Sequence, residues 1–103
     1  MINQIREVAQ QVLPKGAHVW LYGSRARGEA RPDSDWDLLI LVNKDKIGQD
    51  DFNNISYPFI CRGWDLNEMI QPVMYTEKDW KKYSFTPFYK NVEHDKQLIY
   101  GTE

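Results

Sequence analysis

The sequence predicts one small α/β (α+β) domain over residues 1–103, with helices packed on a small mixed β-sheet. Three observations support this prediction: a length of 103 residues with 42% hydrophobic content, amphipathic segments of helical period, and short apolar runs typical of strands. The chain is long enough for one domain with a packed core. A domain of this size buries a modest part of its surface, which leaves room for a partner protein or a homo-oligomer.

The first third of the chain is expected to alternate helix and strand. Apolar residues recur at helical spacing over residues 2–13, and a proline and a glycine follow to end that helix. Residues 17–22 are rich in aromatic and branched side chains, which favours a strand. Ser24 is a suitable N-cap for a helix of one or two turns over 25–30, and the composition of 31–34 predicts a turn.

The middle of the chain contains the strand that we expect at the centre of the sheet. Residues 36–42 are apolar except for Asp37, a pattern typical of a strand buried on both faces. A polar loop over 43–51 leads into a helix over 51–61, and Pro58 is expected to kink that helix.

The last third is expected to supply two strands and two short helices. Residues 64–75 have strand composition, with Pro72 restricted to an edge or a bulge. One helix is expected to begin after Thr76 and another at Thr86-Pro87, because threonine caps helices and proline suits their first position. A final strand is expected over 97–100.

Charge and composition argue against several classes of protein. The formal net charge is -2 and the pI is about 5.7, whereas general nucleic-acid binders are usually basic. The N-terminus lacks the apolar core of a signal peptide, and no apolar run approaches the roughly 20 residues of a membrane span. We therefore expect a cytoplasmic protein without membrane association or general nucleic-acid binding.

The stretch around Gly23 and Ser24 has the pattern of a phosphate-binding turn. A strand, a Gly-Ser turn and a helix start direct free backbone N–H groups and the positive end of the helix dipole toward one point. Gly23 allows close approach of a phosphate, and the Ser24 hydroxyl can add a hydrogen bond.

Asp35 and Asp37 lie two residues apart at the start of a strand, so their side chains are expected on the same face of the sheet. Two carboxylates this close repel each other unless a cation lies between them. Magnesium fits, because it binds a few carboxylates together with water and substrate phosphates. In the alternative interpretation Asp35 caps a turn and Asp37 pairs with Arg25 or Arg27.

The motifs Gly23-Ser24-Arg25-Ala26-Arg27-Gly28 and Ser34-Asp35-Trp36-Asp37-Leu38 together resemble the signature of the DNA polymerase β-like nucleotidyltransferase superfamily, and most of all its minimal branch. The resemblance implies the nucleotidyltransferase fold, with Gly23 and Ser24 holding the β- and γ-phosphates of ATP or another nucleoside triphosphate. It also implies that Asp35 and Asp37 hold two Mg²⁺ ions. Arg25 or Arg27 would neutralise triphosphate charge, with a structural ion pair as an equal alternative for Arg27.

Members of this family usually carry a third carboxylate on a later strand. Glu68 is our first choice for this metal-binding and catalytic position, because it begins the apolar part of the predicted strand. Asp65 is the second choice. In a third alternative, Gln71 occupies the position without the charge.

The resemblance implies an enzyme that transfers a nucleoside monophosphate, AMP from ATP, to an acceptor hydroxyl. The minimal branch resembles the antitoxin half of two-gene systems whose partner is a small helical HEPN protein, so a tyrosine of that toxin is the expected acceptor. The alternative is a nucleotide-binding antitoxin module that masks its partner without catalysis.

Overall fold

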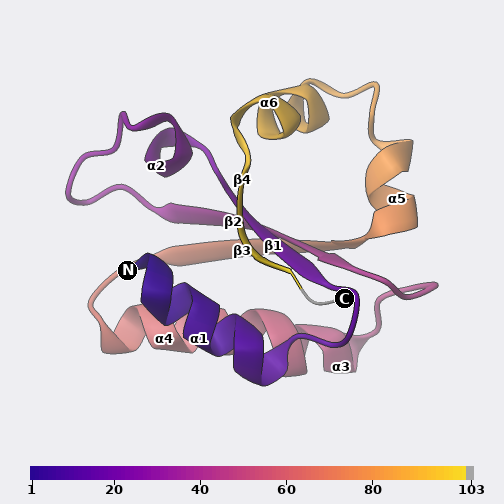
Figure 1. The fold of residues 1–103 in the computed structure, drawn as a ribbon, viewed down its shortest axis with the longest axis horizontal. Coiled ribbons are helices and arrows are strands. Elements are labelled where there is room, and N and C mark those ends of the chain that lie inside the picture. The colour runs from indigo at the N-terminus through magenta and orange to yellow at the C-terminus, as the bar shows by residue number, and fades with distance from the viewer. Residues whose placement is uncertain (102–103) are drawn as a thin grey trace.

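A computed structural model describes residues 1–101 and shows an α/β fold in which a four-stranded sheet lies between helices on both faces (Figure 1). The elements in chain order are α1 (Ile2–Val12), β1 (His18–Tyr22), α2 (Ser24–Arg27), β2 (Trp36–Val42), α3 (Gln49–Asp51), the π-helical segment η1 (Phe52–Ser56), α4 (Tyr57–Asp65), β3 (Ile70–Thr76), α5 (Glu77–Lys82), α6 (Pro87–Asp95) and β4 (Gln97–Gly101).

The sheet has the strand order β3-β2-β1-β4 and is mixed, as predicted. Strand β1 pairs antiparallel with both β2 and β4, whereas β2 and β3 are parallel. The helices α3, η1 and α4 form the crossover that a parallel pair requires. Strand β3 lies at an edge of the sheet, which is one of the two positions predicted for Pro72.

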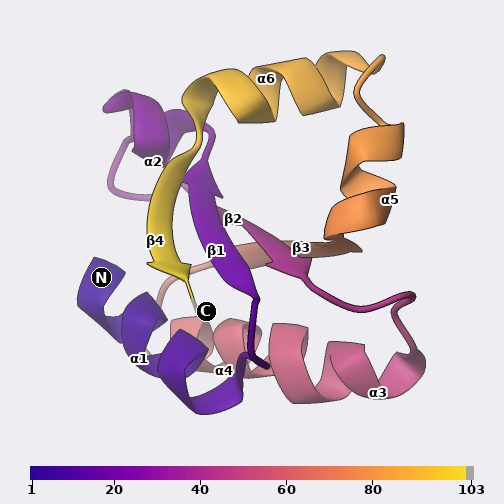
Figure 2. The ribbon, with the colours of Figure 1, turned by 45° about the vertical axis from the view of Figure 1, so that its right-hand side comes forward.

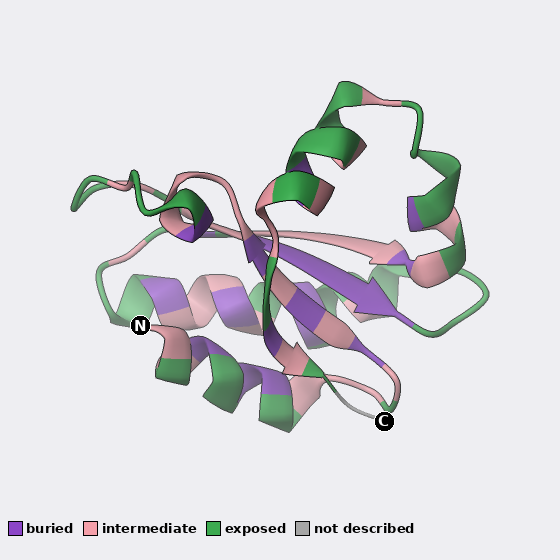
Figure 3. Ribbon diagram, turned by 45° about the horizontal axis from the view of Figure 1, so that its top comes forward, coloured by how far each residue is buried: buried purple, intermediate pink, exposed green. Residues whose placement is uncertain are grey.

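Two hydrophobic cores lie on opposite faces of the sheet. Helices α1 and α4 cover one face, and α5 and α6 cover the other (Figure 2). Successive residues of β2 alternate between them: Leu38 and Ile40 belong to the first core, and Leu39 and Leu41 to the second. The prediction of a central strand buried on both faces is confirmed (Figure 3). The alternation also places Asp37 on the face of α5 and α6.

The two threonine caps predicted from the sequence are formed. The Thr76 hydroxyl accepts a hydrogen bond from the backbone N–H of Asp79 at 3.0 Å, at the start of α5. The Thr86 hydroxyl accepts one from the N–H of Tyr89 at 3.1 Å, and Pro87 occupies the first position of α6. Each side chain satisfies a backbone donor that the helix itself cannot pair.

The strand predicted over 64–75 starts later than expected. Trp64 lies in the last turn of α4, and β3 begins only at residue 70. Backbone hydrogen bonds close the helix end: the N–H of Glu68 donates to the Gly63 carbonyl at 2.8 Å, and Asn67 adopts a positive φ of 59°. This left-handed cap is the usual way for a helix to end, and it holds the chain out of the sheet for several residues.

The helix predicted over 51–61 is longer and is interrupted. Helical structure runs from residue 49 to residue 65, with the π-helical segment η1 in its middle. Pro58 lies in the first turn of α4, where a missing backbone N–H is tolerated best. The change in helix type lies just before Pro58, and the kink stays a prediction.

Candidate functional site

The Gly-Ser turn connects β1 to α2, with Gly23 rather than Ser24 in the N-cap position. Gly23 has φ 78° and ψ -158°, a backbone conformation that side-chain-bearing residues rarely adopt. This corrects the expectation that Ser24 caps the helix, because capping preference had favoured serine while the backbone conformation requires glycine. Ser24 is the first residue of α2, and Gly28 ends that helix in the left-handed conformation, well before residue 30.

Asp37 lies directly beside this turn. In the sheet register its neighbours are Tyr22 on β1 and Gln71 on β3. The backbone of Gly23 packs so closely against the Asp37 carboxylate that a Cβ atom on Gly23 would force the carboxylate to move. The Gly-Ser turn and the Asp37 carboxylate are thus in direct contact.

Negative charge accumulates around Asp37. Burial raises the pKa of its carboxyl above the usual value, and the nearby charge of Asp35 raises it further, while Arg27 acts in the opposite direction. Burial, followed by the charge of Asp37, raises the pKa of the Tyr22 hydroxyl to about 12. The repulsion between Asp35 and Asp37 is the part of the Asp37 shift that a bound cation would relieve.

Asp35 itself precedes β2 and is exposed, while Asp37 is half-buried. The structure therefore brings Asp35, Asp37, Gly23 and Ser24 to the same end of the sheet, as the motif spacing predicted.

Arg27 takes part in ion pairs with residues of its own loop and of a distant helix. Its Nε lies 2.5 Å from a Glu29 carboxylate oxygen, and its Nη1 lies 2.6 Å from Asp95 at the end of α6. The structural alternative that the sequence left open for Arg27 is present in this arrangement. The ion pair with Asp95 joins α2 to α6.

Arg25 stabilises the loop that carries Asp35. Its guanidinium donates to the Ser34 carbonyl at 2.8 Å and to the Pro32 carbonyl at 3.3 Å. Its central carbon also stacks 4.4 Å from the centre of the Trp36 ring. These contacts hold the backbone just before Asp35 and the side chain just after it, so Arg25 positions the segment that carries that carboxylate.

The candidates for a third carboxylate lie apart from the pair. Glu68 is in the turn before β3, and its carboxylate lies 3.9 Å from Arg25. Asp65 is the exposed last residue of α4. Within residues 1–101, no group of three or more His, Cys, Asp or Glu side chains is arranged to hold a metal ion. Gln71 is the candidate that shares the register and the face of Asp37, a relationship that only the parallel pairing reveals.

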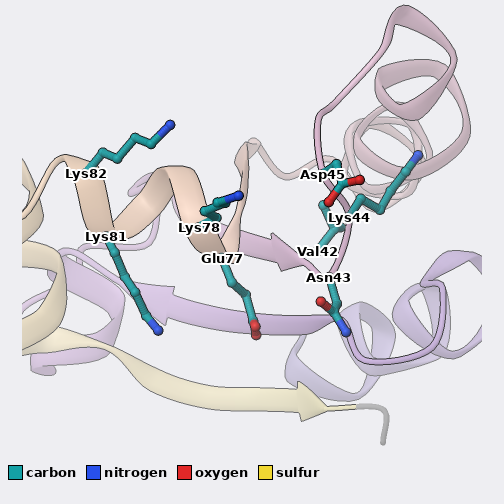
Figure 4. A pocket seen from close by; sticks show the side chains of 8 residues that line it. All are labelled: Val42, Asn43, Lys44, Asp45, Glu77, Lys78, Lys81 and Lys82. Atoms are coloured by element: carbon teal, nitrogen blue, oxygen red, sulfur yellow. The ribbon is translucent and has the colours of Figure 1, made fainter.

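A cavity of about 730 Å³ lies at the other end of β2, and sequence analysis gave no sign of it. Its lining residues are Val42, Asn43, Lys44, Asp45, Glu77, Lys78, Lys81 and Lys82. Figure 4 shows that the lysine side chains leave in different directions instead of converging on one point. Two of them are engaged by carboxylates, Lys44 by Asp51 and Lys82 by Asp79. We therefore place the candidate site at the Gly23 end of the sheet.

In the described part of the chain, residues 1–101, no helix combines the length and the apolar character needed to cross a membrane.

Comparison with known families identifies the class of protein. The nucleotidyltransferase domain family matches residues 2–100, so nearly the whole chain aligns with it. The chain belongs to this family. No curated protein sequence matches it.

Solved structures with the same fold include antitoxins in complex with their toxins. A toxin–antitoxin crystallised with AMP-PNP is 18% identical, with a TM-score of 0.69 over 99% of this chain and 74% of that one. An MNT antitoxin bound to the tri-AMPylated HEPN toxin of Shewanella oneidensis is 17% identical, with a TM-score of 0.63 over 98% and 70%. A variant of the MntA–HpeT toxin–antitoxin is 19% identical, with a TM-score of 0.66 over 98% and 72%. These likenesses confirm the predicted nucleotidyltransferase fold.

Proposed function

We propose that the protein is a magnesium-dependent nucleotidyltransferase that transfers AMP from ATP to an acceptor hydroxyl. The observation that supports this most is the Asp35/Asp37 pair at the end of the sheet where Gly23 and Ser24 form a turn, in a chain of the nucleotidyltransferase domain family. In the reaction, the acceptor oxygen forms a bond to the α-phosphorus, the bond to pyrophosphate breaks, and the hydroxyl proton passes to a base or to water.

The residues at this site fit Mg²⁺. Magnesium binds through one or two carboxylates and takes its remaining ligands from water and substrate phosphates, so the pair Asp35 and Asp37 is a sufficient protein donor set. The raised pKa of Asp37, caused by burial and by Asp35, is the electrostatic cost that a bound cation would remove. When bound, two such ions stabilise charge on the attacking and leaving oxygens.

The other residues of the site would bind and orient the triphosphate. The backbone N–H groups at the start of α2 and the Ser24 hydroxyl are proposed to hold the β- and γ-phosphates. Arg25 keeps the loop of Asp35 in place, and Arg27 supplies positive charge beside Asp37. For the third position we propose Gln71, which lies in the register of Asp37 and carries no charge, with Glu68, which lies beside Arg25, as the alternative.

We further propose that the acceptor is a tyrosine of a small helical HEPN toxin. The similar structures include an MNT antitoxin in complex with a tri-AMPylated HEPN toxin, which supports a modified protein as the product. The chain would then act as an antitoxin that inactivates its partner covalently.

A non-catalytic antitoxin module is the second candidate. It is favoured by one observation, that no third acidic side chain joins Asp35 and Asp37 within residues 1–101. Such a module would bind the nucleotide and mask its partner without transferring AMP.

Label transfer separates the two candidates. The protein is incubated with ATP labelled on the α-phosphate, Mg²⁺ and the protein encoded by the neighbouring gene, and label on protein is followed. We expect labelling of the partner that disappears in the Asp35→Ala/Asp37→Ala variant and persists in the matched surface variant Asp45→Ala, because Asp45 lies at the other end of β2.

A different outcome would overturn the enzyme proposal. If the partner is neutralised without label, and the double aspartate variant neutralises it equally well, the masking module is correct.

A further inference from the structure

A second pocket, of about 370 Å³, opens beside the candidate site. Its lining comes from two loops, one before β2 and one before β3: Pro32, Asp33, Trp64, Asn67, Glu68 and Met69. The two loops are joined at the base of the pocket, because the backbone N–H of Trp36 donates to the Met69 carbonyl at 2.8 Å. This hydrogen bond ties the loop of Met69 to the residue that follows Asp35.

The pocket wall includes an aromatic surface that the fold leaves open. Trp64 is 58% exposed and Met69 is 46% exposed, although both are large apolar side chains. The ring of Tyr57 contacts the Trp64 ring edge-on, with centroids 6.2 Å apart, which supports the indole in place. A supported, exposed indole is a surface on which a planar heteroaromatic ring can stack.

Asn67 supplies a hydrogen-bonding edge at the same place. Its positive φ is explained by the helix cap at the end of α4, but that cap uses only its backbone. Within residues 1–101 the Asn67 side-chain amide has no hydrogen-bond partner, and the residue is exposed. A side-chain amide donates and accepts at once, which matches the amino group and ring nitrogen on the edge of adenine.

The remaining polar groups of the pocket are acidic. Asp33 and Glu68 both line it, and Arg25 lies 3.9 Å from the Glu68 carboxylate. Carboxylates repel a triphosphate and accept hydrogen bonds from the amino group of a base. The pocket thus suits the base end of a nucleotide whose phosphates lie at Gly23 and Ser24.

We propose that this pocket holds the nucleobase of the triphosphate, with the base stacked on Trp64 and adenine selected by the Asn67 amide. The proposal rests on the proposed function, because the pocket lies beside the phosphate and metal site. It extends that function by assigning base recognition to residues 64–69, which lie outside the two sequence motifs.

Calorimetry with three ligands tests the proposal: MgATP, MgGTP and magnesium tripolyphosphate, which lacks a base. Trp64→Ala is expected to weaken MgATP binding about tenfold through loss of stacking and to leave tripolyphosphate binding unchanged. Trp64→Phe is expected to restore most of the ATP affinity. Phe85→Ala is the matched control, since Phe85 is 76% exposed and lies outside the pocket, and it is expected to change neither affinity.

Asn67→Gly provides the second variant. Glycine keeps the left-handed cap of α4 and removes the amide, so the fold is retained. We expect the preference for MgATP over MgGTP to fall to about one, with unchanged tripolyphosphate binding. Circular dichroism checks that each variant is folded.

Two results would overturn the inference while leaving the proposed function intact. One is MgATP affinity that is unchanged in both Trp64→Ala and Asn67→Gly. The other is the same unchanged MgATP affinity together with loss of AMP transfer to the partner protein in these two variants, which would assign the pocket to the acceptor. If the unmodified protein binds neither MgATP nor magnesium tripolyphosphate, the proposed function fails and the base pocket fails with it.

Discussion

Gly23 and Asp37 are in contact across the boundary between the Gly-Ser turn and the central strand. A Cβ atom on Gly23 would lie 2.6 Å from the Oδ2 atom of Asp37, and the φ of Gly23 is 78°. The backbone conformation therefore favours glycine here, and a side chain would in addition displace the Asp37 carboxylate. The residue that leaves the proposed phosphate-binding turn without a side chain is thus also in contact with the proposed metal ligand.

Gly23→Ala is expected to destabilise the fold and to abolish MgATP binding. Positive φ and steric overlap with Asp37 together should lower the free energy of unfolding by roughly 2–4 kcal/mol, measured by urea denaturation. Gly28→Ala is the matched control, because Gly28 has a φ of 75° with open space around its Cα. Gly28→Ala should lower the free energy of unfolding by about 1 kcal/mol and leave MgATP binding unchanged. If the two variants lower the free energy of unfolding and MgATP binding equally, the contact between Gly23 and Asp37 contributes to neither.

Asp37→Asn is expected to stabilise the protein at neutral pH. Burial and the charge of Asp35 raise the pKa of Asp37 in the folded state, so the folded state binds its proton more tightly than the unfolded state. Protonated Asp37 therefore contributes stability at low pH. This contribution is lost as the pH rises from the usual pKa of 3.8 through the raised pKa of the folded state. Removing the charge should therefore raise the free energy of unfolding at neutral pH and have no effect below 3.8.

The pH dependence is measured by urea denaturation from acid to neutral pH. Asp45→Asn, at an exposed position at the far end of β2, should leave the profile unchanged. Added MgATP should stabilise the unmodified protein and fail to stabilise Asp37→Asn. A destabilised Asp37→Asn variant at neutral pH would mean that the carboxylate is already satisfied without a cation.

Arg25→Lys is expected to loosen the loop that carries Asp35. Lysine cannot bond the Ser34 and Pro32 carbonyls while stacking flat on Trp36, so we expect a loss of about 1–2 kcal/mol in unfolding free energy. Weaker MgATP binding should accompany it. Arg31→Lys, at an exposed position, should change the free energy of unfolding by less than about 0.5 kcal/mol and should leave MgATP binding unchanged. Unchanged MgATP affinity in Arg25→Lys would refute the positioning role.

The third position of the proposed metal site is tested by Glu68→Gln and Gln71→Asp. Glu68 lies beside Arg25, so we expect Glu68→Gln to change Mn²⁺ or Mg²⁺ affinity by less than about threefold.

Gln71 is opposite Asp37, so the carboxylate of Gln71→Asp should strengthen metal binding. Repulsion between the two carboxylates should destabilise the metal-free protein by about 0.5 kcal/mol. A hundredfold loss of metal affinity in Glu68→Gln would instead identify Glu68 as the third ligand.

Much of the fold follows from local patterns. The apolar run around Asp37 predicted the central strand, and Thr76 and Thr86 predicted two helix starts, because caps and burial depend on adjacent residues. Pro72 predicted an edge position for the same reason, since a missing N–H constrains only its own strand.

Relationships between distant residues could not be predicted in this way. The pairing of Arg27 with Asp95 joins residues 68 positions apart, and the register that sets Gln71 opposite Asp37 depends on the crossover through α4. The start of β3 was misplaced because the apolar content of the segment near Trp64 fits a helix end as well as a strand.

Calorimetric titration of ATP, with and without Mg²⁺, is the most direct test of the central claim that Asp35 and Asp37 hold the metal for a bound triphosphate. We predict that ATP binding requires Mg²⁺ and falls by at least about a hundredfold in the Asp35→Asn/Asp37→Asn variant, while Asp45→Asn binds normally. ATP binding of equal strength in the presence of a chelator, or in the double variant, would contradict the claim.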